Sequence, residues 1–225
     1  MVVRLTSPIV ELFPFDVIGL IDMLGESLGP EEYTKRLADE IHQVDHVDLR
    51  NWADLVFNAW EQRAGVFIIG NGGSAATATH MSQDFAKSLH PEDQLANPAT
   101  KRLRVQSLTD NVGWLTSVAN DLGYDQIFTQ QLRNLANPGD LLIAISGSGN
   151  SENVLQAVAW ANDAGLVTFG LTGFDGGALA EMCQHGVNVT VNDMGMSEGI
   201  HLCLYHWVLN DVFARINQSG RYAGS

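Results

Sequence analysis

The fold is decided by residues 66–74, which read Val-Phe-Ile-Ile-Gly-Asn-Gly-Gly-Ser. Four consecutive apolar residues predict a short strand that is buried on both faces, as the strands of parallel sheets are. The glycines and the asparagine that follow predict a tight loop, and residues 74–89 predict a helix. A buried strand, a loop and a helix in this order form the repeating unit of doubly wound α/β folds.

The same plan recurs at residues 143–151, Ile-Ala-Ile-Ser-Gly-Ser-Gly-Asn-Ser. Elsewhere, too, short apolar runs alternate with helical patterns. The predicted strands are 66–69, 105–108, 141–145, 167–171 and 187–191, and the predicted helices are 74–89, 112–119, 125–135, 152–164, a short one after Gly177 and 197–217. This alternation predicts a three-layer α/β domain with a parallel sheet, whose ligands bind at the carboxyl ends of the strands.

Two helical patterns precede the first strand, at residues 30–44 and 47–64. The first begins with a proline and two glutamates, which is typical of a helix N-terminus. Together the two patterns predict an N-terminal helical hairpin, which could cover the sheet or pair with another subunit. We interpret residues 1–29 as an N-terminal extension and residues 30–225 as a single domain.

The composition is that of a folded, acidic protein. The chain has 225 residues, of which 45% are hydrophobic and 17% charged, and its formal net charge is −14. This charge argues against nucleic acid or an anionic membrane as a partner, but backbone N–H groups and hydroxyls can still hold a small phosphorylated molecule. The apolar stretch 17–24 lacks the cleavage pattern of a signal peptide, so we expect a cytoplasmic protein. We expect Cys183 and Cys203 to be buried thiols in a reducing compartment.

The two loops have the properties of a phosphate site. Glycine lets a backbone approach a ligand closely, and the N-terminus of a helix presents unpaired N–H groups. Ser146, Ser148 and Ser151 add three hydroxyls. Neither loop matches the dinucleotide pattern G-x-G-x-x-G or the P-loop, so a nucleotide is not favoured. The alternative is that both are ordinary turns with serine caps.

Five motifs, in this order along the chain, resemble those of a known family. They are residues 70–74 with His80 six positions after Ser74, Asn120-Asp121 followed by Gly123 and Tyr124, Ser146–Ser151, the Leu-Thr-Gly-Phe-Asp-Gly-Gly turn at 171–177, and Glu198 with His201 and His206 on the last helix. The pattern, which covers the chain from Pro30 to the end of that helix, resembles the sugar isomerase (SIS) family in its phosphoheptose isomerase branch.

The resemblance implies a five-stranded parallel sheet of the flavodoxin-like type and a homotetramer with active sites at subunit interfaces. It also implies a phosphorylated sugar as partner, the isomerisation of sedoheptulose 7-phosphate to an aldose through an enediol, and one Zn²⁺ per site.

The site residues follow from the motifs. We expect Asp84 as the base and His206 as the acid or a ligand, and we expect a metal held by His80, Asp84, Glu198 and His206. The duties of base and metal ligand conflict for Asp84, and the sequence leaves them open. The residues expected to bind substrate are Asn71, Gly72, Gly73, Ser74, Asn120, Asp121, Ser146, Gly147, Ser148, Ser151 and Glu198.

Helical spacing supports part of this set. His80 and Asp84 are four residues apart, so both project from one face of a helix, and Glu198 and His206 are two turns apart on another. Two histidines and two carboxylates suit Zn²⁺. Taken singly, each of these residues is more often an ordinary surface or core residue, and we expect His201 to be a packing residue.

Three positions depart from the family pattern. Asp84 stands where the family has glutamate, Glu198 where it has glutamine, and Gly147 where it has threonine. These departures leave the identity of the sugar open. The alternatives are a SIS protein without catalysis, either a sugar-phosphate sensor or a replication-initiator-associating protein, and an isomerase of another sugar phosphate.

Overall fold

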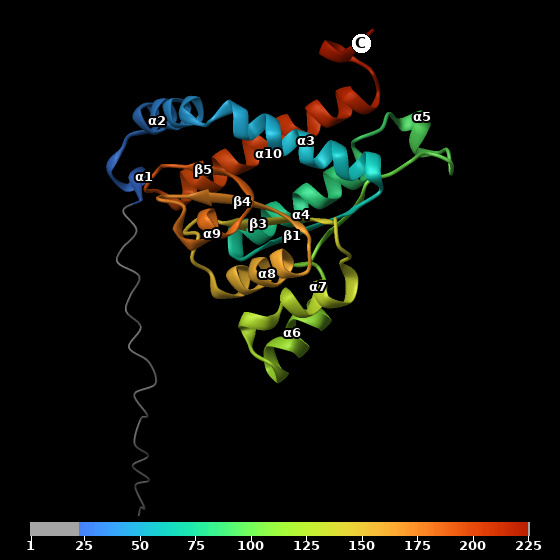
Figure 1. Cartoon of the computed structure of the whole chain (residues 1–225). Helices are drawn as coiled ribbons and strands as arrows, with labels where there is room; N and C mark the ends of the chain where they lie inside the picture. The colour runs from blue at the N-terminus through green and yellow to red at the C-terminus, as the bar shows by residue number, and fades with distance from the viewer. Residues whose placement is uncertain (1–22, 225) are drawn as a thin grey trace, which may run out of the picture.

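A computed structural model describes residues 23–224, and a five-stranded parallel sheet forms its centre (Figure 1). The strands lie in the order β2-β1-β3-β4-β5. They are β1 (Gly65–Gly70), β2 (Arg104–Ser107), β3 (Leu141–Ser146), β4 (Val167–Gly173) and β5 (His185–Val189). The predicted sheet is confirmed, although β5 begins and ends two residues before the predicted strand 187–191.

The apolar strands bury both of their faces, as the run at residues 66–69 predicted. Ile68 and Ile143 pack into an apolar cluster on one face, whereas Phe67 and Leu142 pack into a second cluster on the other. Each of the four is at most 6% exposed. The alternation of strand side chains between the two faces therefore places one half of the core on each side of the sheet.

Helices form the two outer layers. One face is covered by α2 (Pro30–Gln43), α3 (His46–Gln62), α4 (Gly72–Lys87) and α10 (Met194–Ile216). The other is covered by α6 (Val112–Asp121), a 3₁₀ turn at 124–126, α7 (Thr129–Leu135), α8 (Glu152–Asp163) and α9 (Gly177–Met182). A short helix, α5 (Glu92–Leu95), lies on the connection to β2.

The two N-terminal helices are confirmed, but their arrangement as a hairpin is not. Figure 1 shows α3 running on from α2 along the same side of the sheet. A short helix, α1 (Leu24–Ser27), precedes them, and the backbone N–H of Leu24 donates to Asp193 at 2.7 Å. Most of the predicted N-terminal extension, residues 1–22, lies outside the described residues.

The last helix begins three residues earlier than predicted. Asp193 is its N-cap, and the carboxylate accepts a hydrogen bond from the backbone N–H of Met196 at 2.7 Å. Aspartate is among the preferred N-cap residues because its side chain satisfies an otherwise unpaired N–H group. This cap adds Met194 to the helix and thereby places its side chain beside the loops.

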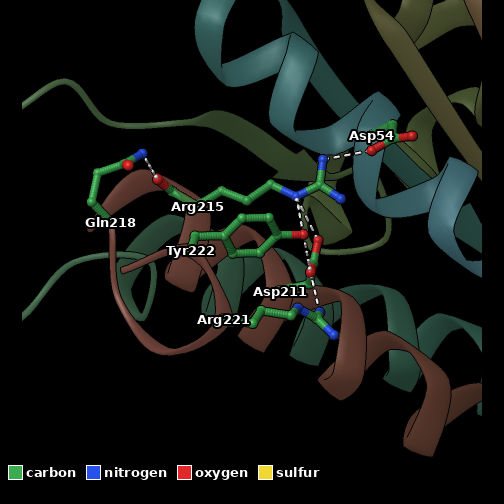
Figure 2. Close-up of polar contacts among 6 residues, drawn as sticks. All are labelled: Asp54, Asp211, Arg215, Gln218, Arg221 and Tyr222. Atoms are coloured by element: carbon green, nitrogen blue, oxygen red, sulfur yellow. Dashed lines mark hydrogen bonds and ion pairs between the residues drawn. The ribbon is translucent and has the colours of Figure 1, made fainter. Parts of the chain in front are cut away.

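A charged network ties the C-terminal turn at 220–222 back to α10 (Figure 2). Asp211 is only 2% exposed, and its carboxylate pairs with Arg215 at 2.8 Å and with Arg221. Tyr222 donates a hydrogen bond to the same carboxylate at 3.0 Å. Arg215 also reaches Asp54 on α3, so the network joins the two helices and the C-terminal turn.

The expectation of two buried thiols was wrong. Cys183 is partly buried, and burial raises its pKa to about 12, whereas Cys203 is exposed on α10. Both are free thiols.

No helix within residues 23–224 has the length and apolarity needed to cross a bilayer.

Candidate active site

The two glycine-rich loops meet where the strand order reverses. The chain passes from β1 outward to β2 and then returns to β3 on the other side of β1, so β1 and β3 are neighbours at the switch point. Gly70 lies opposite Ile145, which makes the loops after these strands start side by side. Asn71 and Asn153 exchange two hydrogen bonds of 2.8 and 2.9 Å across the gap. Ligands of open α/β sheets bind at this point.

The loops enclose a cavity of about 240 Å³ at this point. Nine of the predicted substrate-binding residues line it: Asn71, Gly72, Gly73, Ser74, Ser146, Gly147, Ser148, Ser151 and Glu198. Its wall is completed by Ile145 and Met194. The hydroxyls of Ser146 and Ser151 lie 3.3 Å apart. These hydroxyls and the start of α8 give the cavity the donors that a phosphate needs.

The structure does not bring Asn120 and Asp121 to this cavity. Both are exposed at the end of α6, where the amide of Asn120 donates to Asp121 at 2.7 Å. The next segment instead reaches the first loop through Tyr124, whose hydroxyl donates to the side-chain oxygen of Asn71 at 3.0 Å. A substrate contact from Asn120 or Asp121 stays a prediction.

The turn at residues 171–177 supports the serine-rich loop from behind. Gly149 has a φ of +67°, and a side chain there would overlap the carbonyl of Gly176. The backbone N–H of Gly173 donates to Gly147 at 2.8 Å, and that of Leu179 donates to Gly149 at 2.9 Å. Glycine at 149 is therefore required by both conformation and space.

Met194 explains the absence of a side chain at position 147. A Cβ added to Gly147 would overlap the thioether of Met194. The methionine therefore occupies the space that a threonine would take, and it forms an apolar part of the cavity wall. The departure from the family pattern at 147 is matched by a residue from α10 that becomes part of the site.

We expect Gly147→Ala to destabilise the protein slightly, by up to about 1 kcal/mol, because the added methyl group displaces the flexible end of the Met194 side chain. Met194→Ala in the same chain should restore most of that loss. Urea unfolding of the two single variants and the double variant measures the coupling between them. Gly113→Ala, in helix α6, is the matched control and should be neutral or stabilising. Strictly additive effects of G147A and M194A would contradict the overlap.

Three of the four predicted metal ligands form one group. Oδ2 of Asp84 lies 3.4 Å from Nε2 of His80 and 3.7 Å from Nε2 of His206, and the donor atoms of all three residues lie within 4.8 Å of one another. His80 and Asp84 come from α4, as their spacing predicted, and His206 comes from α10. The histidine side chains are 45% and 42% exposed and that of Asp84 is 14% exposed, so the group opens to solvent on the histidine side.

A backbone hydrogen bond determines which nitrogen of His206 faces the group. Nδ1 of His206 lies 2.8 Å from the carbonyl oxygen of Leu202. A carbonyl only accepts, so Nδ1 carries the proton in the neutral ring and Nε2 keeps its lone pair. Nε2 is the atom that faces Asp84. The ring is therefore in the tautomer that a metal or a substrate proton requires.

Glu198 stands beside this group but is not part of it. It lines both the loop cavity and a second cavity of about 350 Å³, which also contains His80 and Thr77. The carboxylate lies directly over Gly73, where any side chain would overlap it. Burial raises the pKa of Glu198 above its usual value. Glu198 thus connects the loop cavity with the second cavity. Among the described residues, the group that could hold a metal has three members, His80, Asp84 and His206.

The predicted packing role of His201 agrees with its surroundings. The ring is 1% exposed, and Nε2 donates to the carbonyl oxygen of Thr172 at 3.0 Å. Burial lowers the pKa of His201 to about 4, and the hydrogen bond to Thr172 opposes this only in part. The ring is therefore neutral in the folded protein near pH 7.

This shift makes stability depend on pH. Because the folded pKa lies below the usual 6.5, the unfolded chain takes up the proton first as the pH falls. The neutral ring of His201 contributes about 3 kcal/mol to the free energy of unfolding. This contribution is complete above about pH 6.5 and is lost as the pH falls to 4. We expect His201→Gln, which keeps an N–H donor, to flatten this part of the curve of unfolding free energy against pH. Parallel curves for the two proteins would contradict the assignment.

The residues present fit a zinc ion. Two neutral imidazole nitrogens and one carboxylate oxygen are donors that zinc accepts, and three protein ligands leave a position open for another oxygen. His206 satisfies the further requirement that its second nitrogen be hydrogen-bonded. The fourth predicted ligand, Glu198, lies outside the group of three and faces the cavity.

Two further residues, Met194 and Tyr205, belong to the site. The sequence pattern predicts that the last helix begins at Ser197, which leaves Met194 outside the helix. Tyr205 has the features of a core residue and is 0% exposed, yet its hydroxyl donates to Asp84 at 3.2 Å. Burial first, and then the nearby carboxylate, raise the pKa of Tyr205, so its hydroxyl keeps its proton. Its position next to His206 is the only feature of the sequence that indicates a role for Tyr205 in the site.

Comparisons with known proteins identify the family of the chain. The family model described as SIS domain matches residues 31–173. A phosphoheptose isomerase of Synechocystis is 37% identical over 72% of this chain and 80% of its own length.

Solved structures give the same result. The phosphoheptose isomerase of Francisella tularensis has a TM-score of 0.74 and 28% identity over 81% of this chain and 93% of its own. That of Neisseria gonorrhoeae has a TM-score of 0.72 and 29% identity over 80% of this chain and 92% of its own. Sheet, loops and similarity agree, and the chain belongs to the SIS domain family and, within it, to the phosphoheptose isomerases.

Proposed function

We propose that this protein isomerises sedoheptulose 7-phosphate to D-glycero-D-manno-heptose 7-phosphate. One observation carries the proposal: a group of His80, Asp84 and His206 lies beside a cavity that joins the phosphate-type loops at the switch point of the sheet. The similarity to phosphoheptose isomerases supports the choice of sugar.

The phosphate group would bind at the serine-rich loop. Ser146, Ser148 and Ser151 line the cavity, and α8 begins at Glu152 directly after the last of them. Backbone N–H groups at a helix start and serine hydroxyls hold a dianion without any basic side chain. The sugar chain would then extend past Glu198 into the second cavity, which contains His80.

The reaction moves one proton from C1 to C2 of the sugar. Asp84 would take the proton from C1 and return it to C2, and His206 would exchange protons with the sugar oxygens through Nε2. Glu198 would hold sugar hydroxyls between the two cavities. Alternatively, His80, Asp84 and His206 would hold a zinc ion, which would polarise the sugar carbonyl as a Lewis acid. Nε2 of His206 would then bind the metal instead of exchanging protons, because its single lone pair cannot do both.

Two further points belong to the same proposal. Exposed apolar residues, Val112, Leu122 and Tyr124, lie on and just after α6, and Tyr124 contacts the first loop through Asn71. They support a homotetramer in which a neighbouring subunit completes the site. The acidic composition supports a protein without a nucleic acid or membrane partner, and the lack of a signal-peptide pattern at 17–24 supports the cytoplasm as its compartment.

Incubation with sedoheptulose 7-phosphate in D₂O tests the proposal. We expect the aldose to form with deuterium at C2, because a base that exchanges its proton with solvent delivers deuterium there. Thermal stabilisation by the sugar phosphate without turnover would favour the sensor over the enzyme. If the protein neither turns over the sugar phosphate nor is stabilised by it, the heptose assignment is contradicted.

A further inference from the structure

One buried side chain contacts every member of the three-residue group. Tyr205 is 0% exposed, and its hydroxyl donates to Oδ2 of Asp84 at 3.2 Å. Its ring stacks on His206 with centroids 4.1 Å apart and planes 28° apart. The same ring meets His80 edge-on, with centroids 5.5 Å apart. A single side chain therefore restrains the carboxylate and both imidazoles at once.

The exposure of the four residues places the tyrosine behind the group. The side chains of His80 and His206 are nearly half exposed, that of Asp84 is 14% exposed, and Tyr205 is fully covered. A ligand reaches the group from the histidine side. Tyr205 can therefore affect it only through the residues that it contacts.

Both oxygens of Asp84 have donors from the protein. Tyr205 donates to Oδ2, and the side-chain amide of Gln83 donates to Oδ1 at 2.8 Å. The side chain of Gln83 is exposed, whereas Tyr205 is buried in the core. Hydrogen bonds from such outer residues orient a metal ligand, and their loss typically weakens metal binding 10- to 100-fold.

We propose that Tyr205 is the positioning residue of this site, which holds Asp84, His80 and His206 in the arrangement that binds a divalent metal ion. It takes no proton and touches no substrate. The inference rests on the metal site of the proposed function and adds the residue that organises it.

Metal titration of Tyr205→Phe tests the inference, because this change removes the hydroxyl and keeps the ring. Co²⁺, followed by its visible absorption, and Zn²⁺, followed by calorimetry, report binding without any turnover. We expect Y205F to bind both ions 10- to 100-fold more weakly than the natural protein. Tyr205→Met, which also loses the stacked ring, should bind at least as weakly and serves if Y205F does not fold.

Tyr222→Phe is the matched control. Tyr222 also donates to a buried carboxylate, that of Asp211, but its partners are in the C-terminal network rather than in the site. Y222F should therefore lose stability and keep its metal affinity. Equal affinity of Y205F and the natural protein would overturn the inference, and so would a natural protein that binds neither ion. The proposed function is judged separately, because it fails only if the natural protein does not turn over the heptulose phosphate.

Discussion

Replacing Asp84 with asparagine is expected to lower kcat/KM for sedoheptulose 7-phosphate about 10²–10⁴-fold. The amide has the same size but cannot take a proton, and it is a poor ligand for zinc. Turnover in D₂O measures the loss. Asp163→Asn, at an exposed position on α8 across the sheet, is the matched control and should retain full activity.

The metal content of the same variant separates the two roles of Asp84. If D84N binds zinc nearly as well as the natural protein but does not turn over, Asp84 acts mainly as the base. If the activity and the metal are lost together, Asp84 acts mainly as a ligand. Activity within tenfold of the natural protein would contradict both roles and would leave the proton transfer to another group, for which Glu198 is a candidate because it lines both cavities.

Replacing Asp211 with alanine is expected to destabilise the protein by about 3 kcal/mol or more. The carboxylate is 2% exposed and faces two arginines, so its removal leaves the guanidinium of Arg215, which is 18% exposed, without its buried partner. Losing one partner of a buried pair typically costs about 3–5 kcal/mol. Urea unfolding gives the value.

Asp54→Asn is the control for this prediction because it removes another partner of the same Arg215. The side chain of Asp54 is 53% exposed, and exposed pairs contribute about 1 kcal/mol or less. The two variants should therefore differ by at least 2 kcal/mol. Equal losses would contradict a buried anchor at Asp211 and would make the network of Figure 2 an ordinary surface feature.

Much of the fold could be predicted because local sequence determines it. Strands such as 66–69 are apolar on both faces, and their loops contain the glycines and serines that a close backbone approach requires. The spacing of His80 and Asp84 similarly follows from the helix period. The hairpin was not confirmed because the helical patterns at 30–44 and 47–64 do not determine the angle between the helices.

The rest of the site depends on contacts between distant segments. Tyr205 and Asp84 are 121 residues apart, and a buried tyrosine next to a histidine has the pattern of ordinary core packing. Met194 enters the site on a helix that Asp193 caps and that begins three residues before the predicted start. Asn120 and Asp121 lie exposed at the end of α6 and hydrogen-bond to each other, an outcome that their sequence does not determine.

Helix α10 carries Glu198, His206 and the Asp211 anchor on one continuous stretch of 23 residues. Each residue of an α-helix turns the next by about 100° and advances it by about 1.5 Å. One residue inserted between Glu198 and His206 would therefore rotate the imidazole by more than a quarter turn away from Asp84, even with every side chain of the site unchanged. Within this family the number of residues between the positions of Glu198 and His206 should be constant, whereas the exposed residues between them should be free to vary.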